Sequence, residues 1–225
     1  KIVELYNELK NNASYNKIVG KDFLIVEYKC PVDTEKFQLL TEVHFIMYVF
    51  SGRKDWITSG KTYEINEGDA FFFRKGAYTT RQHFEVEHCV LLFFMDEDFI
   101  RKFVLENNPV NAPENEESLY EQVFELDVND ALKSLFYGMF NYLKMGREIP
   151  GNLVDIKFKE LLFAIILNKK NRKLAQFFAS LNHTGRTNLD FVMMRNFQYD
   201  LQLEEFARLC GRSLSAFKRD FQNFF

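Results

Sequence analysis

Several features that would place the chain in a common class are scarce or missing. Among its 225 residues are only three cysteines and four histidines. Cys30, Cys89 and Cys210 lie far apart and form no C-x-x-C pair, so their spacing indicates neither a disulfide framework nor a zinc site. No apolar run reaches the roughly 18 residues of a membrane span, and the first residues lack the apolar core of a signal peptide. These absences favour a soluble, cytoplasmic protein with reduced thiols and no membrane partner.

A strong excess of one charge is also missing. The 29 basic and 32 acidic residues give a net charge of −3, so any contact with DNA must come from a local patch. Such a patch is present between residues 208 and 219, which contain Arg208, Arg212, Lys218 and Arg219 and no acidic residue. The composition is 47% hydrophobic with 26 phenylalanines, which predicts aromatic-rich cores for one large domain or two ordinary ones.

Residues 18–95 have the pattern of a β domain. Apolar, β-branched and aromatic runs of strand length occupy residues 23–28 and 43–50, and turn residues separate the runs. The run 83–95 alternates at first and then becomes wholly apolar, as in a strand buried on both faces. Ser59-Gly60 predicts a two-residue hairpin loop. This spacing predicts a sandwich or barrel of about eight strands, preceded by a non-helical arm over residues 1–17.

Helical periodicity dominates after Met95. It predicts helices over 98–103, 131–145, 153–168, 172–181 and 188–197. Asp96 is expected to cap the first of these helices, a loop is expected over 106–117, and a polar link is expected over 183–186. The apolar stripes of the two long helices are each more typical of an internal core than of an interface.

The stretch 201–225 carries the most specific pattern. Two apolar faces at helical spacing are formed by Leu203, Phe206, Ala207 and Leu209, and by Leu214, Phe217 and Phe221. Gly211 between them can take the positive φ of a tight turn, and Ser213 can cap the second helix. The opposite side of the second helix carries polar side chains suited to base edges and phosphates. On pattern alone, a packed helical pair with a solvated charged face remains the more common arrangement.

The residues of this stretch resemble the first helix-turn-helix of the AraC/XylS family of bacterial transcription regulators. The runs LEEFARLCGRS (203–213) and FKRDF (217–221) match most positions of that family's pattern, although Gln202 stands where the family usually has a serine or threonine cap. The resemblance implies that the helix from Ser213 enters the major groove of promoter DNA, with Arg212 on a phosphate. The candidate DNA-contacting residues are Arg212, Ser213, Ser215, Lys218, Arg219 and Gln222.

A second resemblance concerns the predicted β domain. Residues 63–76, within the longer run 52–76, are similar to a turn-strand-turn of the cupin domain that precedes the helix-turn-helix in many AraC-type regulators. Together the two resemblances imply an α+β chain with a cupin-like barrel or jelly roll, a helical linker and a carboxy-terminal helix-turn-helix. The expected boundaries are 1–95 for the regulatory domain, 96–185 for the linker and dimerisation region, and 186–225 for an incomplete DNA-binding domain. One stripe within 131–168 is expected to form a homodimer, and a second helix-turn-helix is expected further along the protein.

Many cupins are metal enzymes, and this chain lacks most of the ligand pattern of such enzymes. A transition-metal site needs three or four converging nitrogen or oxygen ligands. Here His44 stands alone near the first ligand position, and Tyr78-Thr79 occupies the second. His83 and His88, five residues apart, fall on opposite faces of a regular strand. With no nucleophile signature and no glycine-rich phosphate loop, the sequence predicts no catalytic residue, metal or cofactor, and hence no enzyme.

The barrel is therefore expected to bind rather than catalyse. Aromatic residues on candidate strands could line an apolar pocket for a small effector, namely Phe45, Tyr48, Trp56, Tyr63 and Phe72. A barrel filled by its own aromatic side chains, which senses a protein partner or nothing, fits the pattern as well. The sequence thus predicts a DNA-binding transcription regulator controlled through its amino-terminal domain. The alternative is a non-catalytic ligand-binding or partner-binding cupin that does not bind DNA.

Overall fold

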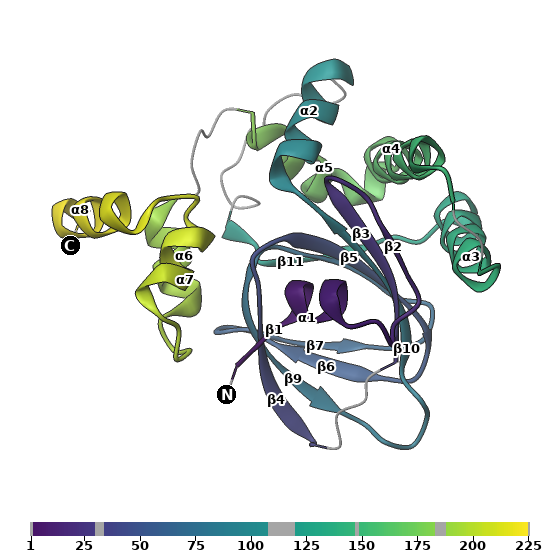
Figure 1. Ribbon diagram of the computed structural model, residues 1–225, viewed down its shortest axis with the longest axis horizontal. Coiled ribbons are helices and arrows are strands. Elements are labelled where there is room, and N and C mark those ends of the chain that lie inside the picture. Colours follow the sequence, from purple (N-terminus) through teal and green to yellow (C-terminus); the bar gives the residue numbers. More distant parts are fainter. Residues whose placement is uncertain (1, 30–33, 108–119, 147–148, 183–187, 225) are drawn as a thin grey trace.

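The computed structural model describes residues 2–29, 34–107, 120–146, 149–182 and 188–224 (Figure 1). Two sheets face each other, with strand orders β1-β4-β9-β6-β7 and β11-β8-β5-β10-β3-β2. The strands are β1 (Val3–Glu4), β2 (Lys17–Val19), β3 (Phe23–Lys29), β4 (Lys36–Thr41), β5 (His44–Ser51), β6 (Lys54–Ile57), β7 (Thr62–Ile65), β8 (Ala70–Phe73), β9 (Gly76–Gln82), β10 (Cys89–Met95) and β11 (Val123–Leu126). All neighbouring strands pair antiparallel except β1 and β4.

Helices occupy most of the remaining described chain. They are α1 (Leu5–Asn11), α2 (Glu97–Asn107), α3 (Asp130–Lys144), α4 (Gly151–Leu167), the short 3-10 helix η2 (Lys169–Asn171), α5 (Arg172–Ser180), α6 (Leu189–Asn196), α7 (Leu203–Leu209) and α8 (Leu214–Phe224). The predicted helices are confirmed with small shifts at their ends. Asp96 Oδ1 accepts a hydrogen bond from Asp98 N at 2.8 Å, which confirms the expected cap of α2. The loop expected over 106–117 and the link over 183–186 lie almost entirely outside the described residues.

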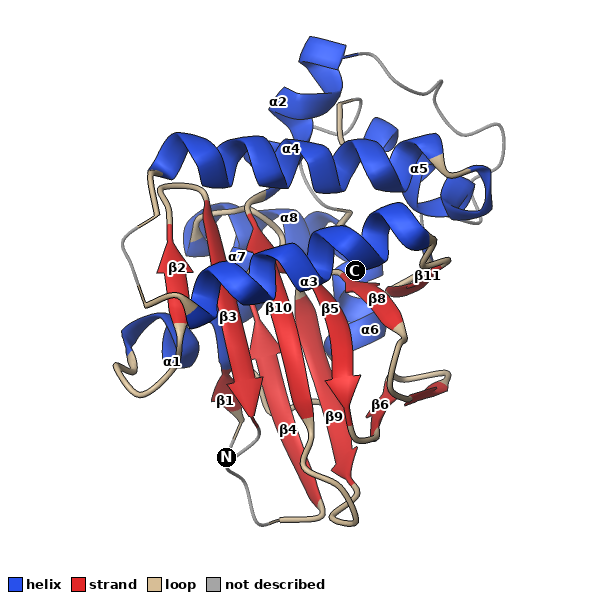
Figure 2. Cartoon of the chain, turned by 90° about the vertical axis from the view of Figure 1, so that its right-hand side faces the viewer, coloured by secondary structure: helices blue, strands red, loops and turns tan. Residues whose placement is uncertain are grey.

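The sheet that contains β5 is buried on both faces. Along β5, Phe45 and Met47 point into the barrel, whereas Ile46 and Tyr48 point outward, as the period of two requires. Helices α3 and α4 cover the outer face (Figure 2). Because both faces are covered, apolar residues occupy successive positions and the strand reads as a continuous apolar run.

Three sequence-based expectations for the barrel need correction. Residues 5–11 form α1, whose buried Leu5 and Leu9 pack into the barrel core, and the helix ends at Asn12, where the backbone becomes extended. Strand β11 adds to the sheet from within the predicted linker. The predicted strand 83–95 begins only at Cys89, so His83 and His88 lie in the connection from β9 and not on one strand. The hairpin loop at Ser59-Gly60 is confirmed by a 2.9 Å hydrogen bond from Thr58 N to Lys61 O.

The apolar stripes of α3 and α4, one of which was expected to form a homodimer, are buried inside the molecule. The apolar residues of α3 and α4 pack against the outer face of the sheet in one core, including Leu132, Leu135, Phe136, Met139, Leu143, Phe158, Leu161, Leu162 and Ile165. The outward side chains of β3, β5 and β10 are apolar and require cover, which explains why these stripes turn inward. They are therefore not free to form a dimer.

Candidate nucleic-acid interface and its junction with the barrel

The turn between α7 and α8 has the geometry that its residues predict. Gly211 has a φ of 64°, a conformation that favours glycine, and Arg212 N donates to Ala207 O at 2.9 Å. Ser213 Oγ accepts from Ala216 N at 3.3 Å and so begins α8. At the start of α7, Gln202 N donates to Glu205 Oε2 at 2.6 Å, so the first helix is stabilised at its start although it lacks the usual serine or threonine.

Helix α8 presents a polar face to solvent. Ser215, Lys218, Arg219 and Gln222 are all exposed and recur at helical spacing, so the structure brings these four predicted residues together. Arg219 also lies 3.4 Å from Asp220, through Nη2 and Oδ1. Figure 1 shows α8 extending away from the barrel. The described part of the barrel therefore leaves this face open.

Arg212 does not belong to that open face. Its side chain is only 12% exposed, its Nε lies 3.0 Å from Asp220 Oδ2, and its Nη1 donates to Cys210 O at 3.0 Å. The hydrogen bond from Arg212 lowers the pKa of Asp220, so the pair is charged at neutral pH. Arg212 holds α7 and α8 together. Its expected role as a phosphate contact stays a prediction, and its partner in the structure, Asp220, lies beyond the acid-free stretch considered in the sequence.

Arg208 is also engaged within the molecule. Its Nε lies 2.5 Å from Oε1 of Glu42, in the turn that follows β4, and this contact raises the pKa of Arg208. The two residues are 166 positions apart, so no local pattern could have paired them. The basic patch predicted from the sequence thus divides into a barrel contact at Arg208, an internal contact at Arg212, and an exposed remainder at Lys218 and Arg219.

The helix-turn-helix rests on the barrel through a small core. Its apolar members from the barrel are Leu40 and Ala77, and those from the helices are Leu189, Phe191, Val192, Tyr199, Phe206, Ala207, Leu209, Cys210 and Phe217. Asn196, which is 2% exposed, accepts a 2.7 Å hydrogen bond from Ala77 N through its Oδ1. Gly76 has a φ of 154°, and a Cβ there would lie 3.2 Å from Asn196 Oδ1. This docking surface, made by β4, β9, α6 and α7, joins the two parts of the chain.

The five predicted pocket residues do not line one pocket. Phe45 and Trp56 face the barrel interior with Tyr63 packed against them, whereas Tyr48 and Phe72 lie on the outer face under the helices. Phe45 and Tyr48 are three positions apart on one strand, and the period of two alone places them on opposite faces. The cavity in the interior measures only about 20 Å³, room for a single water molecule. The described interior therefore matches the filled barrel.

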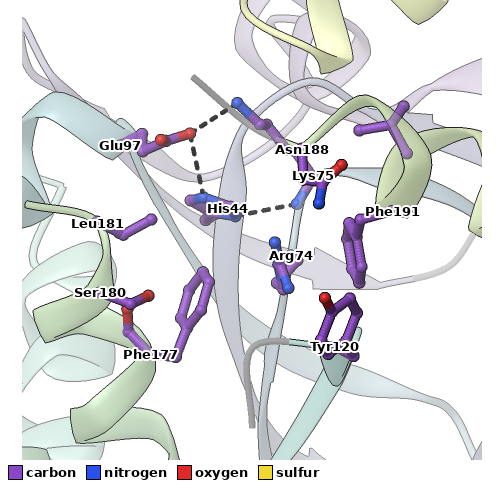
Figure 3. Close-up of a pocket in the computed structure, with 11 residues that line it drawn as sticks. His44, Arg74, Lys75, Glu97, Tyr120, Phe177, Ser180, Leu181, Asn188 and Phe191 are labelled. Atoms are coloured by element: carbon purple, nitrogen blue, oxygen red, sulfur yellow. Dashed lines mark hydrogen bonds and ion pairs between the residues drawn. The ribbon is translucent and has the colours of Figure 1, made fainter. Parts of the chain in front are cut away.

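A larger cavity of about 120 Å³ lies where the barrel, the helical layer and α6 meet (Figure 3). It is lined by His44, Arg74, Lys75, Glu97, Tyr120, Phe177, Ser180, Leu181, Asn188, Phe191 and Val192. None of these residues was predicted as a pocket residue, because they come from six separate stretches of the chain. The one local signal was the pair Arg74-Lys75, two charges at the end of an apolar strand.

A partly buried polar network of one histidine and two charged residues occupies one wall of this cavity. Lys75 Nζ lies 2.6 Å from Glu97 Oε2, His44 Nε2 lies 3.7 Å from the same oxygen, and Lys75 N donates to His44 Nδ1 at 3.0 Å. Burial alone would raise the pKa of Glu97, but the contacts with His44 and Lys75 outweigh it and lower that pKa well below its ordinary value. Burial lowers the pKa of His44. The imidazole is therefore neutral, and Nε2 carries its proton.

Arg74 forms another wall. Figure 3 shows its side chain between Phe177 and Phe191, and the guanidinium carbon lies 4.5 Å and 3.9 Å from the two ring centroids. Nη1 also donates to Glu121 O at 3.2 Å. Burial lowers the pKa of Arg74 to about 10, so the side chain remains charged at neutral pH. A buried cation flanked by two aromatic faces thus connects α5, through Phe177, with α6, through Phe191.

Neither a candidate metal cluster nor a candidate membrane-spanning helix occurs in the described residues. In those ranges, no group of three or more histidine, cysteine, aspartate or glutamate side chains is arranged to hold a metal ion. No helix within the same ranges has both the length and the apolar character needed to cross a bilayer.

The fold combines a barrel, a helical layer and a helix-turn-helix, as expected for a regulator of the AraC type. Comparison with known proteins identifies the family. The profile of the ExsA N-terminal regulatory domain matches residues 44–177, more than half of the chain. The chain therefore belongs to the ExsA N-terminal regulatory domain family, which confirms the resemblance to AraC/XylS regulators. A regulatory domain is not an enzyme, so the family also confirms that prediction. The match runs from β5 into α5, and the helix-turn-helix lies outside it.

Two curated relatives and one solved structure extend the comparison. The thermoregulatory protein LcrF of Yersinia pestis is 24% identical over 77% of this chain and 64% of its own length. The virulence regulon transcriptional activator VirF of Yersinia enterocolitica is 22% identical over 89% of this chain and 73% of its own length. A crystal structure of apo ToxT from Vibrio cholerae matches 91% of this chain with a TM-score of 0.55 and 7% identity, and it shows the shared fold. The chain thus spans about two thirds to three quarters of these proteins.

Proposed function

We propose that this chain belongs to a transcription activator that binds promoter DNA in the bacterial cytoplasm through α8. The observation that carries the proposal is the exposed face of Ser215, Lys218, Arg219 and Gln222 on the second helix of a well-formed helix-turn-helix. An α-helix fits the major groove, where serine, glutamine, lysine and arginine can contact base edges and phosphates. VirF is described as a transcriptional activator, which supports activation as the outcome.

The amino-terminal domain would control this activity through the docking surface. Arg208 with Glu42 and Asn196 with Ala77 fix the position of α6 and α7 on the barrel. Any effector or protein partner that moves the barrel surface would therefore move the helices that carry α8. The alternative of a cupin that does not bind DNA would leave the polar face of α8 without a ligand, and the DNA-binding experiment decides between the two.

The test uses the full-length protein and DNA sites selected from a random oligonucleotide pool. Arg219→Ala should weaken binding to the selected site by about 1–3 kcal/mol if Arg219 contacts a base. Lys218→Ala should weaken binding to all sequences alike and reduce the salt dependence by about one unit of slope. Lys133→Ala on α3, an exposed lysine remote from α8, is the matched control. If no sequence is enriched, or if Arg219→Ala and Lys218→Ala bind like the control, the proposal fails.

We also propose a homodimer within residues 131–168, formed by a different face of α4 from the one expected. Ile156 and Leu167 are 59% and 76% exposed, and Phe163 between them is partly exposed on the same side of the helix. Positions 156, 163 and 167 recur at intervals of seven and four, so they form one stripe. An exposed apolar stripe of this kind favours contact with a second copy.

Light scattering after gel filtration tests the homodimer. The double variant Ile156→Glu/Leu167→Glu should elute as a monomer, whereas Val19→Glu, at an exposed apolar residue on the edge strand β2, should leave the dimer intact. A native protein that is monomeric at micromolar concentration, or a double variant that still dimerises, would rule out this face.

A further inference from the structure

A groove of about 370 Å³ lies between β7 and β11, the last strands of the two sheets on this side of the barrel. Residues of η2 and α5 complete the groove, and we call it the edge groove. Its apolar lining is Tyr63, Val123, Phe124 and Leu174, and its lysines are Lys61, Lys170 and Lys173. We infer that the edge groove binds an extended acidic segment of a partner protein, which adds a strand to β11. This inference goes beyond the proposed function and rests on it only for an effect on DNA binding.

The outer edge of β11 offers main-chain groups for a further strand (Figure 2). Arg74 N donates to Gln122 O at 3.0 Å where the antiparallel pairing of β8 with β11 begins. Main-chain groups alternate in such a ladder, so Phe124 also faces β8, whereas Val123 and Glu125 turn their N–H and C=O groups away from it. No described residue forms a hydrogen bond with these groups. They are the groups that an added strand would pair with.

The same edge already bonds to a side chain that imitates a strand. Asn171 Oδ1 accepts from Asp127 N at 2.8 Å, and Asn171 Nδ2 donates to Asp127 O at 3.3 Å. Asp127 lies two residues beyond Glu125, so its main-chain groups point to the same side. Asn171 is 2% exposed and lines the edge groove. The groove therefore lies on the side of β11 where a further strand would form its hydrogen bonds.

The charges around the groove favour an acidic segment. The lining and the exposed stretch 169–173 carry five basic side chains and two acidic ones, namely Lys61, Lys169, Lys170, Arg172 and Lys173 against Glu121 and Glu125. Lys173 Nζ lies 2.8 Å from Glu121 Oε1. Lys170 Nζ lies 2.9 Å from Oδ1 of Asp127, just outside the lining. The side chains outside these two pairs have an excess of two positive charges, which two carboxylates of a partner would balance.

The main-chain edge distinguishes a peptide from other polyanions. A nucleic acid can contact lysines, but it has no alternating N–H and C=O groups to pair with β11. An extended peptide has these groups, and its side chains alternate between two faces. Acidic side chains at every second position can therefore meet the basic residues, while the residues between them contact Tyr63 and Phe124.

The edge groove is close to a helix that docks the helix-turn-helix. Arg195 of α6 donates through Nη2 to Tyr120 O at 2.9 Å, shortly before β11 begins. A Cβ at Gly60, in the hairpin that leads into β7, would lie 3.9 Å from Arg195 Nη1. The end of α6 thus contacts the segments that lead into both strands of the groove, so a bound segment changes the surroundings of α6.

The experiment selects peptides from a phage library of random nonapeptides on the full-length protein without DNA. The enriched peptides should carry acidic residues at alternate positions. A fluorescent synthetic copy of the most enriched peptide is the probe for anisotropy titrations. Of two copies that are N-methylated at alternate residues in either phase, one should bind at least about tenfold more weakly, because it loses N–H donors. No enrichment, a basic or neutral consensus, or equal binding of both copies and the parent would overturn the inference.

A proline on each edge strand locates the added strand. Glu125→Pro removes an outward N–H from β11, a position where an edge strand tolerates proline, and should weaken peptide binding at least about tenfold. Glu64→Pro is the matched control on β7. The 2.9 Å hydrogen bond from Thr58 N to Lys61 O sets the alternation of that hairpin, so Glu64 N–H also points outward. Equal binding by the two variants would overturn the pairing with β11.

Charge reversal keeps the inference testable if Glu125→Pro fails to fold. Lys169→Glu/Arg172→Glu changes two exposed residues and should weaken binding of the acidic peptide at least about tenfold at low salt. Lys21→Glu/Lys36→Glu, at exposed positions before β3 and at the start of β4, changes the net charge equally and should bind the peptide normally. The same affinity in both double variants would overturn the location.

A measurement of DNA binding separates this inference from the proposed function. If α8 binds DNA, saturating peptide should change the affinity for the selected site by about fivefold or more in the native protein and not in Glu125→Pro. The same change in both proteins would place the peptide on α8 and overturn the location. An unchanged affinity in the native protein would overturn the effect on DNA binding. A protein that binds the peptide but no DNA would contradict the proposed function alone.

Discussion

The interior of the barrel and the docking surface on its outside are built in different ways. The interior is filled with aromatic rings, such as Phe45 stacked on Phe73 with centroids 4.7 Å apart, and it holds little open space. The docking surface has a small apolar core, one buried amide at Asn196 and an exposed ion pair at Arg208. The first kind of contact costs more free energy to disturb than the second. The barrel is thus suited to act through its surface.

The largest effect is expected inside the barrel. Phe45→Ala removes a fully buried ring between Phe73, Trp56 and Phe94, and should lower the free energy of unfolding by about 3–5 kcal/mol. Denaturant unfolding followed by circular dichroism measures the change. Phe84→Ala, at an exposed position before β10, is the control and should stay within about 0.5 kcal/mol. A loss at Phe45 no larger than the control's would contradict the rigid interior.

The next largest effect on stability depends on pH and is caused by His88, which is buried in the same interior. Burial, and next the charge of Lys54, lower the pKa of His88 from 6.5 to about 3. The unfolded chain therefore binds a proton that the folded chain does not, and stability should fall as pH decreases from 6.5 towards 3. In this range, protonation of His88 lowers the free energy of unfolding by ~1.4 kcal/mol per pH unit.

Unfolding in urea at pH 7, 6 and 5 checks this expectation. The variant His88→Gln cannot be protonated in this range, so its stability should depend less on pH than that of the native protein. Parallel pH dependences for the two proteins would show that His88 is not held neutral by the fold.

A moderate effect is expected at the docking surface. Asn196→Ala leaves the buried N–H of Ala77 without its acceptor, which should cost about 1–3 kcal/mol. Hydrogen exchange followed by mass spectrometry should show faster exchange in α6 and at the start of β9, with the rest of the barrel unchanged. Asn141→Ala, on the exposed side of α3, is the matched control. Equal protection at Ala77 in both variants would mean that Asn196 does not hold the two parts together.

The smallest effect is expected for the ion pair at the rim of the docking surface. Arg208 is half exposed, so its coupling to Glu42 should be only about 0.2–1 kcal/mol at low salt and should decrease as salt is added. A double-mutant cycle with Glu42→Gln and Arg208→Gln measures this coupling by denaturant unfolding. A coupling of zero, or one that is independent of salt, would remove Arg208 from the docking surface.

Local patterns predicted much of this architecture. Apolar runs located most of the strands, the cap at Asp96, whose Oδ1 accepts from Asp98 N at 2.8 Å, located the start of a helix, and Gly211 located the turn. The same patterns missed α1 and β11, which are short and are stabilised by the barrel rather than by their own periodicity. The family resemblance correctly indicated the class of protein.

The sequence by itself determined most of the strands and helices and the exposed polar face of α8, because each depends on residues a few positions apart. Only the tertiary structure decided what Arg208, Arg212 and the pocket aromatics do. Arg208 pairs with Glu42, which lies 166 residues away in the sequence. Which face of a strand points into the barrel depends on the layers that cover the sheet. The cavity at the junction has the same origin, since residues from His44 to Val192 meet there only when the barrel, the helical layer and α6 pack together.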